Sequence, residues 1–459
     1  MATQELSRSL KSRHITMISI GGIIGAGLFV GSSVAIDAAG PAIVLSYILT
    51  GALIFLVMRM LGEMAVSNSG VRSFTEFARL GLGDWAGFVS GWLYWYFWIM
   101  VVPVEAIAGA NILKAWIALP AWELGLLLMA AMTAVNMMST RSYGEFEFWF
   151  SSVKVAAIIS FIVVCTAWLA GLIPHAGGHV APAFANLTSH GGFMPHGVAS
   201  VLGGAVTVFF ALTGAEITTV AAAESEEPAR AIGKLTTTLV LRIIAFYVLS
   251  IFLIVCVAPW NTVRVGESPF VLALGTIGVS WASTAMSFIV LTAVLSCLNS
   301  AFYVCSRVMF TLAEKGDAPG WIIQLNSRKV PTRSVWISAI AGVLGVLAAI
   351  LAPTTVFATL VSASGALILF VYILIALAQI RLRRQRDAAG LPPPAFRMWA
   401  FPVLSWIAIA GMGVVLLAMA VTPSQQKDLF FSLLALAIAT GAYFAVRTRR
   451  TAVTSSPAS

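Results

Sequence analysis

Five glycines fall within one apolar stretch, GGIIGAGLFVGS at 21–32. Glycine inside a helix costs about 1 kcal/mol relative to alanine, so such crowding needs a reason. The pairs Gly21/Gly25 and Gly27/Gly31 match the small-residue spacing by which membrane helices pack closely. Alternatively, the glycines let the chain leave helical geometry, so that backbone N–H groups face a carboxylate and freed carbonyls face an ammonium group. A zwitterionic amino acid needs both.

A second interruption favours the ligand-binding interpretation. The stretch FFALTGAEITT at 209–219 places Gly214 in the middle of another apolar run. Many transporters contain two inverted halves, each with one broken helix, and bind substrate between the breaks near the bilayer midplane. Irregular backbone at that depth is tolerated only where it lines a cavity. Phe210, just before the second break, is either a core residue or a lid over bound substrate.

Three ionisable residues lie inside apolar runs, where charge is expensive and usually functional. Glu105, two residues after Pro103, either is hydrogen-bonded in a packed bundle, pairs with a substrate amine or carries a proton. Lys154 either reaches back to the membrane interface or is a buried cation that loses its proton during transport. Glu216 is expected to gate the second break or to support it.

The composition indicates the elements that must position these residues. The chain has 459 residues, of which 59% are hydrophobic and 10% charged, against about 25% charged in soluble proteins. It is therefore predicted to be an all-α membrane protein. Apolar runs long enough to cross a hydrocarbon core of about 30 Å recur throughout. About twelve helices are predicted, at roughly 15–38, 41–67, 85–115, 121–139, 147–172, 196–222, 236–259, 270–314, 333–352, 355–380, 398–421 and 427–447.

The spacing of the two breaks suits five helices followed by five in inverted order, with two helices added. We therefore expect a single transmembrane transporter domain over 1–459. Its parts are a cytoplasmic tail (1–14), a first repeat (15–172), a second repeat with its preceding outside loop (173–380), two last helices with their preceding basic loop (381–447) and a disordered cytoplasmic tail (448–459).

The distribution of positive charge predicts the orientation. With the N-terminus inside, all but three of the 27 lysines and arginines lie on cytoplasmic segments or adjoining helix ends. The exceptions are Lys114, Arg264 and Lys427. By the positive-inside rule both termini are cytoplasmic. This asymmetry explains the net charge of +9 without a nucleic-acid partner. The basic loop at 381–397 is expected to maintain the topology and to touch anionic membrane lipid.

Cysteines and histidines predict neither disulfides nor a metal site. All four cysteines, Cys165, Cys256, Cys297 and Cys305, fall in apolar helices and are interpreted as small packing residues. Four of the five histidines lie in the loop 173–196 at irregular spacing, with no Cys or Asp beside them. No nucleophile–base pair is visible, and no Gly-Lys-Ser/Thr follows the first glycine-rich stretch, so neither an enzyme nor a phosphate-binding loop is expected.

Several motifs resemble a known family. GGIIGAGLF (21–29), GAE (214–216) with AAAESEEP (221–228), and EFEFWFSSVK (145–154) resemble bacterial amino acid permeases of the amino acid–polyamine–organocation superfamily. Further stretches resemble the γ-aminobutyrate (GABA) permeases of that family; these are LKSRHITM (10–17), VGSSVAIDAAGPA (30–42), GWLYWYFW (91–98), GGFMPHG (191–197) and SCLNSAFY (296–303). Sister permeases for proline and aromatic amino acids share many of these segments.

The resemblance implies a leucine-transporter-like fold with helices 1 and 6 unwound in mid-membrane. The substrate carboxylate would then meet the backbone around Ala26 and Gly27. The ammonium group would meet carbonyls near Ile23 and near Phe210 and Thr213, beside Gly214 of the second break. Some relatives have a serine at the position of Ala26, so carboxylate binding here must rest more on backbone N–H groups.

Other positions follow from the same resemblance. Glu105 would face the pocket, and Lys154 would replace the sodium ion that other members use. Cys297 and Asn299 lie in an amphipathic stretch linked to substrate access. Phe210 stands where others have tryptophan, which leaves the shape of a lid open.

Together these features predict a proton-coupled secondary active importer of a small amino acid, GABA, that works by alternating access in the bacterial inner membrane. The alternatives are a permease for proline or an aromatic amino acid, or an amino acid/amine exchanger. A channel or a nutrient sensor is a third class. We expect a monomer that uses the proton gradient as its energy source and needs no cofactor. GABA has a longer amine-to-carboxylate span than an α-amino acid, so it should need a second anchor, for which Glu105 is the candidate.

Overall fold

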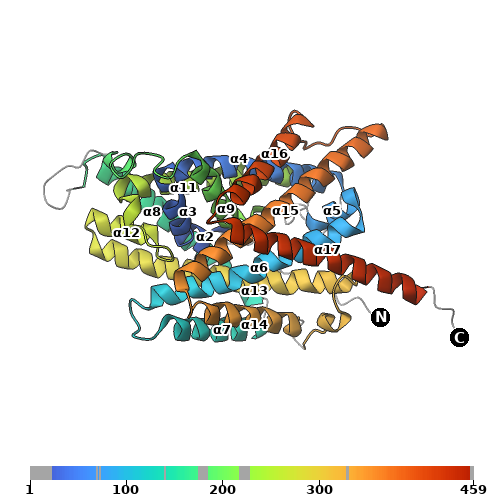
Figure 1. Cartoon of the computed structure of the whole chain (residues 1–459), viewed down its shortest axis with the longest axis horizontal. Helices are drawn as coiled ribbons and strands as arrows, with labels where there is room; N and C mark the ends of the chain where they lie inside the picture. The colour runs from blue at the N-terminus through green and yellow to red at the C-terminus, as the bar shows by residue number, and fades with distance from the viewer. Residues whose placement is uncertain are drawn as a thin grey trace.

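The computed structural model describes residues 23–68, 71, 74–138, 141–173, 184–216, 228–326 and 330–454, and all the regular structure in these residues is helical (Figure 1). This confirms the prediction of an all-α fold for the described residues. Gly21, Gly22 and the stretch 221–227 lie outside them, as do His175 and His179.

The helices follow one another in two groups. The first group is α2 (Ala26–Phe29), α3 (Ser32–Ala39), α4 (Ile43–Ser67), α5 (Phe74–Leu82), α6 (Asp84–Leu113), α7 (Ala121–Met138) and α8 (Arg141–Leu169). The second is α9 (Val198–Leu212), α11 (Pro228–Val257), α12 (Pro269–Ile277), α13 (Ser280–Glu314), α14 (Thr332–Ala348), α15 (Pro353–Ala388), α16 (Val403–Val421) and α17 (Gln426–Thr454). Short 3₁₀ turns occur at Gly40–Ala42, Ala185–Leu187, Trp260–Thr262 and Gly320–Ile323.

Many of these helices are long and apolar enough to cross a membrane. In the described part of the chain there are eight such segments, the longest running from Ala26 to Ser67 across α2, α3 and α4. Shorter apolar segments occur at Ala121–Met137, Val198–Leu212 and Ile244–Val257, of which the last is the end of α11, a helix of 30 residues from Pro228 to Val257. The count of twelve spans therefore stays a prediction.

Four boundaries differ from the sequence prediction. Helix α17 continues to Thr454, into the segment from residue 448 that the sequence predicts to be a disordered tail. The single helix predicted over 270–314 is wrong, because the chain turns at Gly278 (φ 87°) between α12 and α13. Left-handed glycines commonly end helices. The segment 68–84, which the prediction leaves as a connection between the helices at 41–67 and 85–115, contains α5. Helix α15 continues to Ala388, through the arginine-rich run, since arginine and glutamine favour helix and the next left-handed glycine is Gly390.

The packing brings distant segments together at the centre. Helix α6 contacts α13, α14 and α15, while α9 packs against α3, α4 and α15. The four-residue α2 contacts α6, α9 and α13. Figure 1 shows α7 and α14 side by side along one edge, with α2 and α9 well inside the bundle. The two stretches that contain Gly25 and Gly214, almost 200 residues apart in sequence, are thus neighbours in space.

Candidate functional site

The first interruption surrounds Gly25. This residue is extended (φ −136°, ψ −152°), and α2 after it lasts only from Ala26 to Phe29 before a turn at Val30 and Gly31. A side chain at position 25 would begin 2.5 Å from Sγ of Cys297 and 2.9 Å from the Glu105 carboxylate. Glycine at position 25 therefore leaves the space that the Cys297 and Glu105 side chains occupy.

The second interruption follows α9, which ends at Leu212. Thr213 is extended (φ −67°, ψ 145°), and Gly214 has a φ of 113°, which residues with a side chain rarely adopt. The Thr213 hydroxyl donates to the carbonyl of Phe209 at 2.7 Å and so satisfies one acceptor at the helix end. The two interruptions are in contact, because a side chain at Gly27 would begin 2.8 Å from Cα of Ala211.

Glu105 of α6 is buried against the first interruption, with 1% of its surface exposed. The Ala26 N–H donates to both of its carboxylate oxygens, at 3.0 and 3.1 Å. The Cys297 thiol forms a hydrogen bond with the same carboxylate. Glu105 is thus the hydrogen-bond partner of the Ala26 N–H, the group that the family resemblance assigns to the substrate carboxylate.

Lys154 of α8 is fully buried, and its Nζ donates to Oγ of Ser296 at 3.0 Å. The side chain thus ends inside the protein, on Ser296, rather than at an exposed end of α8. Ser296 directly precedes Cys297 on α13, and Cys297 packs against Gly25. The lysine is therefore joined to the first interruption through one turn of α13.

Tyr247 of α11 is a central residue that sequence reasoning missed. Its hydroxyl is fully buried and donates to the carbonyls of Ile23, at 2.9 Å, and Ala211, at 3.2 Å. A hydroxyl has one proton, so the two carbonyls share a single donor. The Phe210 carbonyl, which the sequence favoured as an ammonium ligand, accepts instead from the Thr213 N–H at 3.4 Å. The carbonyls of Ile23 and Ala211 are thus the pair that converges on one donor, the Tyr247 hydroxyl.

Glu216 anchors the second interruption. Its carboxylate accepts from the hydroxyls of Tyr94 on α6 and Tyr372 on α15 and from the N–H of Gly214, each at 2.9 Å. These bonds connect two helices to the irregular segment, as expected for a supporting role. Neither tyrosine carries a signal in the sequence, since both lie in apolar runs where an aromatic residue is ordinary.

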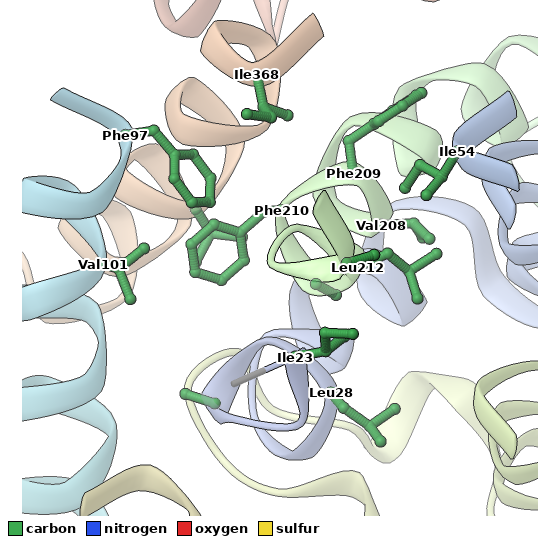
Figure 2. Packing of buried hydrophobic residues seen from close by; sticks show 14 of the residues in the cluster. Ile23, Leu28, Ile54, Phe97, Val101, Val208, Phe209, Phe210, Leu212 and Ile368 are labelled. Carbon is green, nitrogen blue, oxygen red and sulfur yellow. The ribbon is translucent and has the colours of Figure 1, made fainter. Parts of the chain in front are cut away.

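Phe210 lies over the first interruption and is 5% exposed. Its ring centroid is 6.0 Å from that of Phe97, and its Cε1 is 3.4 Å from where a side chain at Gly27 would begin. Figure 2 shows the ring turned toward Phe97 and Val101 of α6. The ring therefore fills the space between Phe97 of α6 and the backbone at Gly27.

Asn299 is not brought to this cluster. Its side-chain oxygen accepts from the amide of Asn136 on α7 at 2.8 Å. Two residues along an α-helix correspond to about 200° of rotation, so Asn299 faces away from the direction that Cys297 takes. All four cysteines are free and buried. Across the described ranges, no three His, Cys, Asp or Glu side chains are grouped so as to hold a metal ion.

Comparison with known proteins identifies the class of protein that this site belongs to. The family model "Amino acid permease" matches residues 14–452. The chain is 43% identical over 446 residues to the gamma-aminobutyric acid permease of Bacillus subtilis (strain 168), covering 97% of this chain and 94% of the relative. It is 42% identical over 428 residues to the gamma-aminobutyric acid permease of Escherichia coli (strain K12), covering 92% and 91%. It is also 35% identical over 428 residues to the aromatic amino acid transport protein AroP of Escherichia coli O157:H7, covering 93% of each.

These matches span almost the whole chain, and with its apolar helices they define an integral membrane transporter rather than an enzyme. The chain belongs to the amino acid permease family.

Proposed function

We propose that this permease is a proton-coupled secondary active importer of GABA that works by alternating access in the bacterial inner membrane. Two relatives over 40% identical along nearly their whole length are named as permeases for that substrate. In this proposal the chain has twelve spans, a five-plus-five inverted repeat, cytoplasmic termini and a monomeric state. The interruptions near Gly25 and Gly214 are its unwound helices 1 and 6.

One observation carries the proposal. A backbone N–H, that of Ala26, faces a carboxylate, and the carbonyls of Ile23 and Ala211 converge on one hydrogen-bond donor. These are the two chemical functions that a zwitterion requires. In this structure the protein itself supplies the partners, Glu105 and Tyr247. Substrate binding then exchanges these internal partners for the substrate carboxylate and ammonium group.

An ammonium group suits the converging carbonyls better than a hydroxyl does. It carries three donors, so it satisfies Ile23 and Ala211 together and has one N–H left. When the substrate carboxylate takes the N–H groups of Ala26 and Gly27, the Glu105 carboxylate is released to receive that third N–H. This gives the longer GABA molecule its second anchor and makes Glu105 responsive to substrate. Phe210 closes over the bound molecule.

Lys154 is the residue that we propose for proton coupling. Its burial and its bond to Ser296 place a titratable amine beside the first interruption, at one end of the chain Lys154–Ser296–Cys297–Gly25. Loss of its proton would weaken that bond and free the first interruption to move. The proton gradient then supplies the energy, and no cofactor is required.

The test is uptake of labelled GABA into proteoliposomes under an imposed proton gradient. We expect accumulation above the outside concentration that collapses when the gradient is dissipated. Uptake driven equally well by a sodium gradient alone would overturn proton coupling. Uptake that requires internal substrate would identify an exchanger instead. Competition by unlabelled phenylalanine or proline stronger than by GABA would reassign the substrate to the specificity of a sister permease.

A further inference from the structure

The arginine-rich run at the end of α15 contains two kinds of arginine. Arg383 donates to Glu63 of α4 at 3.1 Å and to Asp387 at 3.0 Å, so its charge is neutralised within the protein. Arg386 donates to the carbonyl of Pro392 at 3.0 Å. Both therefore hold the helix end and the following segment in place.

Arg381 and Arg384 differ from these neighbours. Both are exposed, and within the described ranges neither has a carboxylate partner or a hydrogen bond to the protein. They lie on the same side of α15, because residues three apart on a helix are neighbours. The sequence run thus splits into a paired and an unpaired face, which composition alone does not reveal.

The unpaired face lines an open groove between three helices, which we call the arginine groove. It is lined by Leu82, Leu377, Ile380, Arg381, Arg384, Gln385, Ala388 and Trp406. Its walls come from α15, from the end of α5 and from the start of α16, and α15 and α16 project from the bundle at the same end of the molecule (Figure 1). Helix α5 is held tightly against α15, since a side chain at Gly81 would begin 2.8 Å from Cα of Ala378.

The groove lining changes from apolar to basic along α15, where Leu377 and Ile380 are followed by Arg381 and Arg384. Leu82 and Trp406 add apolar surface, and no carboxylate is among the lining residues. The same boundary occurs in α15 as a whole, where an apolar segment gives way to charged residues at Arg381. In a membrane protein such a boundary marks the headgroup level. Guanidinium groups match the geometry of phosphate, and juxtamembrane basic residues attract anionic lipid.

We propose that the arginine groove is a binding site for an anionic phospholipid. Its phosphodiester pairs with Arg381 and Arg384, and an acyl chain lies along Leu377, Ile380 and Trp406. This inference depends on the chain being a membrane protein and is independent of which amino acid it transports. A lipid bound here would bridge α5, α15 and α16 and would neutralise the two arginines that the protein leaves unpaired.

The test is native mass spectrometry of the full-length protein with phosphatidylglycerol or phosphatidylcholine of identical acyl chains. The double variant Arg381→Gln/Arg384→Gln is compared with Arg386→Gln/Arg397→Gln. The control removes the same amount of charge from the basic segment 381–397 but outside the groove. We expect the wild type and the control to retain one phosphatidylglycerol preferentially. The groove variant should bind it roughly tenfold to thirtyfold more weakly, since each basic residue contributes a factor of about five.

Three results would overturn the proposal. The first is equal retention of phosphatidylglycerol by the groove variant and the wild type. The second is equal loss in both double variants, which would indicate general surface charge. The third is stabilisation of the protein against heating by inorganic phosphate to the same extent as by phosphatidylglycerol, which would make the site one for a free anion.

A second measurement uses the wild type and needs no arginine variant, so it tests the proposal even if the groove variant does not fold. Trp406 is 45% exposed in the groove, so a brominated acyl chain bound there should quench its fluorescence. We expect brominated phosphatidylglycerol to quench the wild type more than brominated phosphatidylcholine does, and the difference to disappear in Trp406→Phe. Equal quenching by the two lipids in the wild type would also overturn the proposal.

Discussion

The two interruptions solve the same problem in different ways. At the second, the backbone from Thr213 to Glu216 finds partners within its own segment, since Glu216 accepts from the nearby Gly214 N–H and Thr213 caps the end of α9. At the first, the backbone groups depend on side chains from distant helices. Glu105 of α6 takes the Ala26 N–H, and Tyr247 of α11 reaches the Ile23 carbonyl.

This difference bears on which backbone groups can exchange their protein partner for substrate. A backbone group held by its own segment is costly to free, because an unpaired buried polar group costs about 1–3 kcal/mol. A group held by a side chain from another helix can exchange that partner for a ligand of the same chemistry. We therefore interpret the first interruption, together with the Ala211 carbonyl that shares Tyr247 with it, as the exchangeable part of the site. The segment from Thr213 to Glu216 is its fixed frame. Four substitutions test this assignment.

The largest effect is expected from Lys154→Ala, which removes the buried amine bonded to Ser296. Gradient-driven accumulation of labelled GABA in proteoliposomes should be abolished, while exchange of internal for external GABA persists. Ser296→Ala keeps the amine and serves as the control, with a smaller loss of accumulation. Wild-type accumulation by Lys154→Ala would remove this residue from proton coupling.

Glu105→Ala should come next, because it removes both the internal carboxylate and the second anchor for the ammonium group. We expect the Kd for GABA to rise by more than about tenfold, the equivalent of 1.4 kcal/mol. In Glu105→Gln the amide oxygen can still accept from the Ala26 N–H but the charge is gone. The Kd of this variant for GABA should therefore lie between those of the wild type and Glu105→Ala. Titration calorimetry checks both, and an unchanged Kd for Glu105→Ala would exclude this residue from the pocket.

Glu216→Gln probes the fixed frame. An amide has only one oxygen to accept from Tyr94, Tyr372 and the Gly214 N–H, so one buried donor or more loses its partner. Stability should fall by about 1–3 kcal/mol, seen as a lower unfolding temperature in detergent. The Kd for GABA should change by less than about threefold. A large loss of affinity without loss of stability would contradict the division into frame and exchangeable part.

Tyr247→Phe should have the smallest effect, about 1 kcal/mol in the stability of the substrate-free protein. Its matched control is Tyr47→Phe, because the Tyr47 ring is a neighbour of Tyr247, with 6.2 Å between the two ring centroids. The Tyr47 hydroxyl is buried without a hydrogen-bond partner among the described residues, so its loss should leave the unfolding temperature unchanged. Saturating GABA should reduce the deficit of Tyr247→Phe, because the ammonium then serves the Ile23 and Ala211 carbonyls. An equal deficit with and without GABA would assign Tyr247 a purely structural role.

Much of the fold was predictable because its signals are local. Apolar runs and sparse charge indicated helices and a membrane, and the helical prediction is confirmed for the described residues. Errors occurred where a single residue decides, as at Gly278, whose left-handed backbone separates α12 from α13. The motifs indicated the amino acid permease family, which the family match confirms. The assigned substrate and coupling residues remain predictions that the variants above address.

The sequence by itself determined that this chain is a helical membrane protein, where its glycines interrupt apolar runs and which charges enter them. These are properties of composition and of neighbours along the chain. Only the tertiary structure decided the partners. Glu105 meets Ala26 across 79 residues, and Tyr247 meets Ile23 across 224. Adjacent arginines of one run are paired or unpaired according to the face of α15 they occupy. Hydrogen bonds and ion pairs are short-range interactions, so their partners are set by how the helices pack.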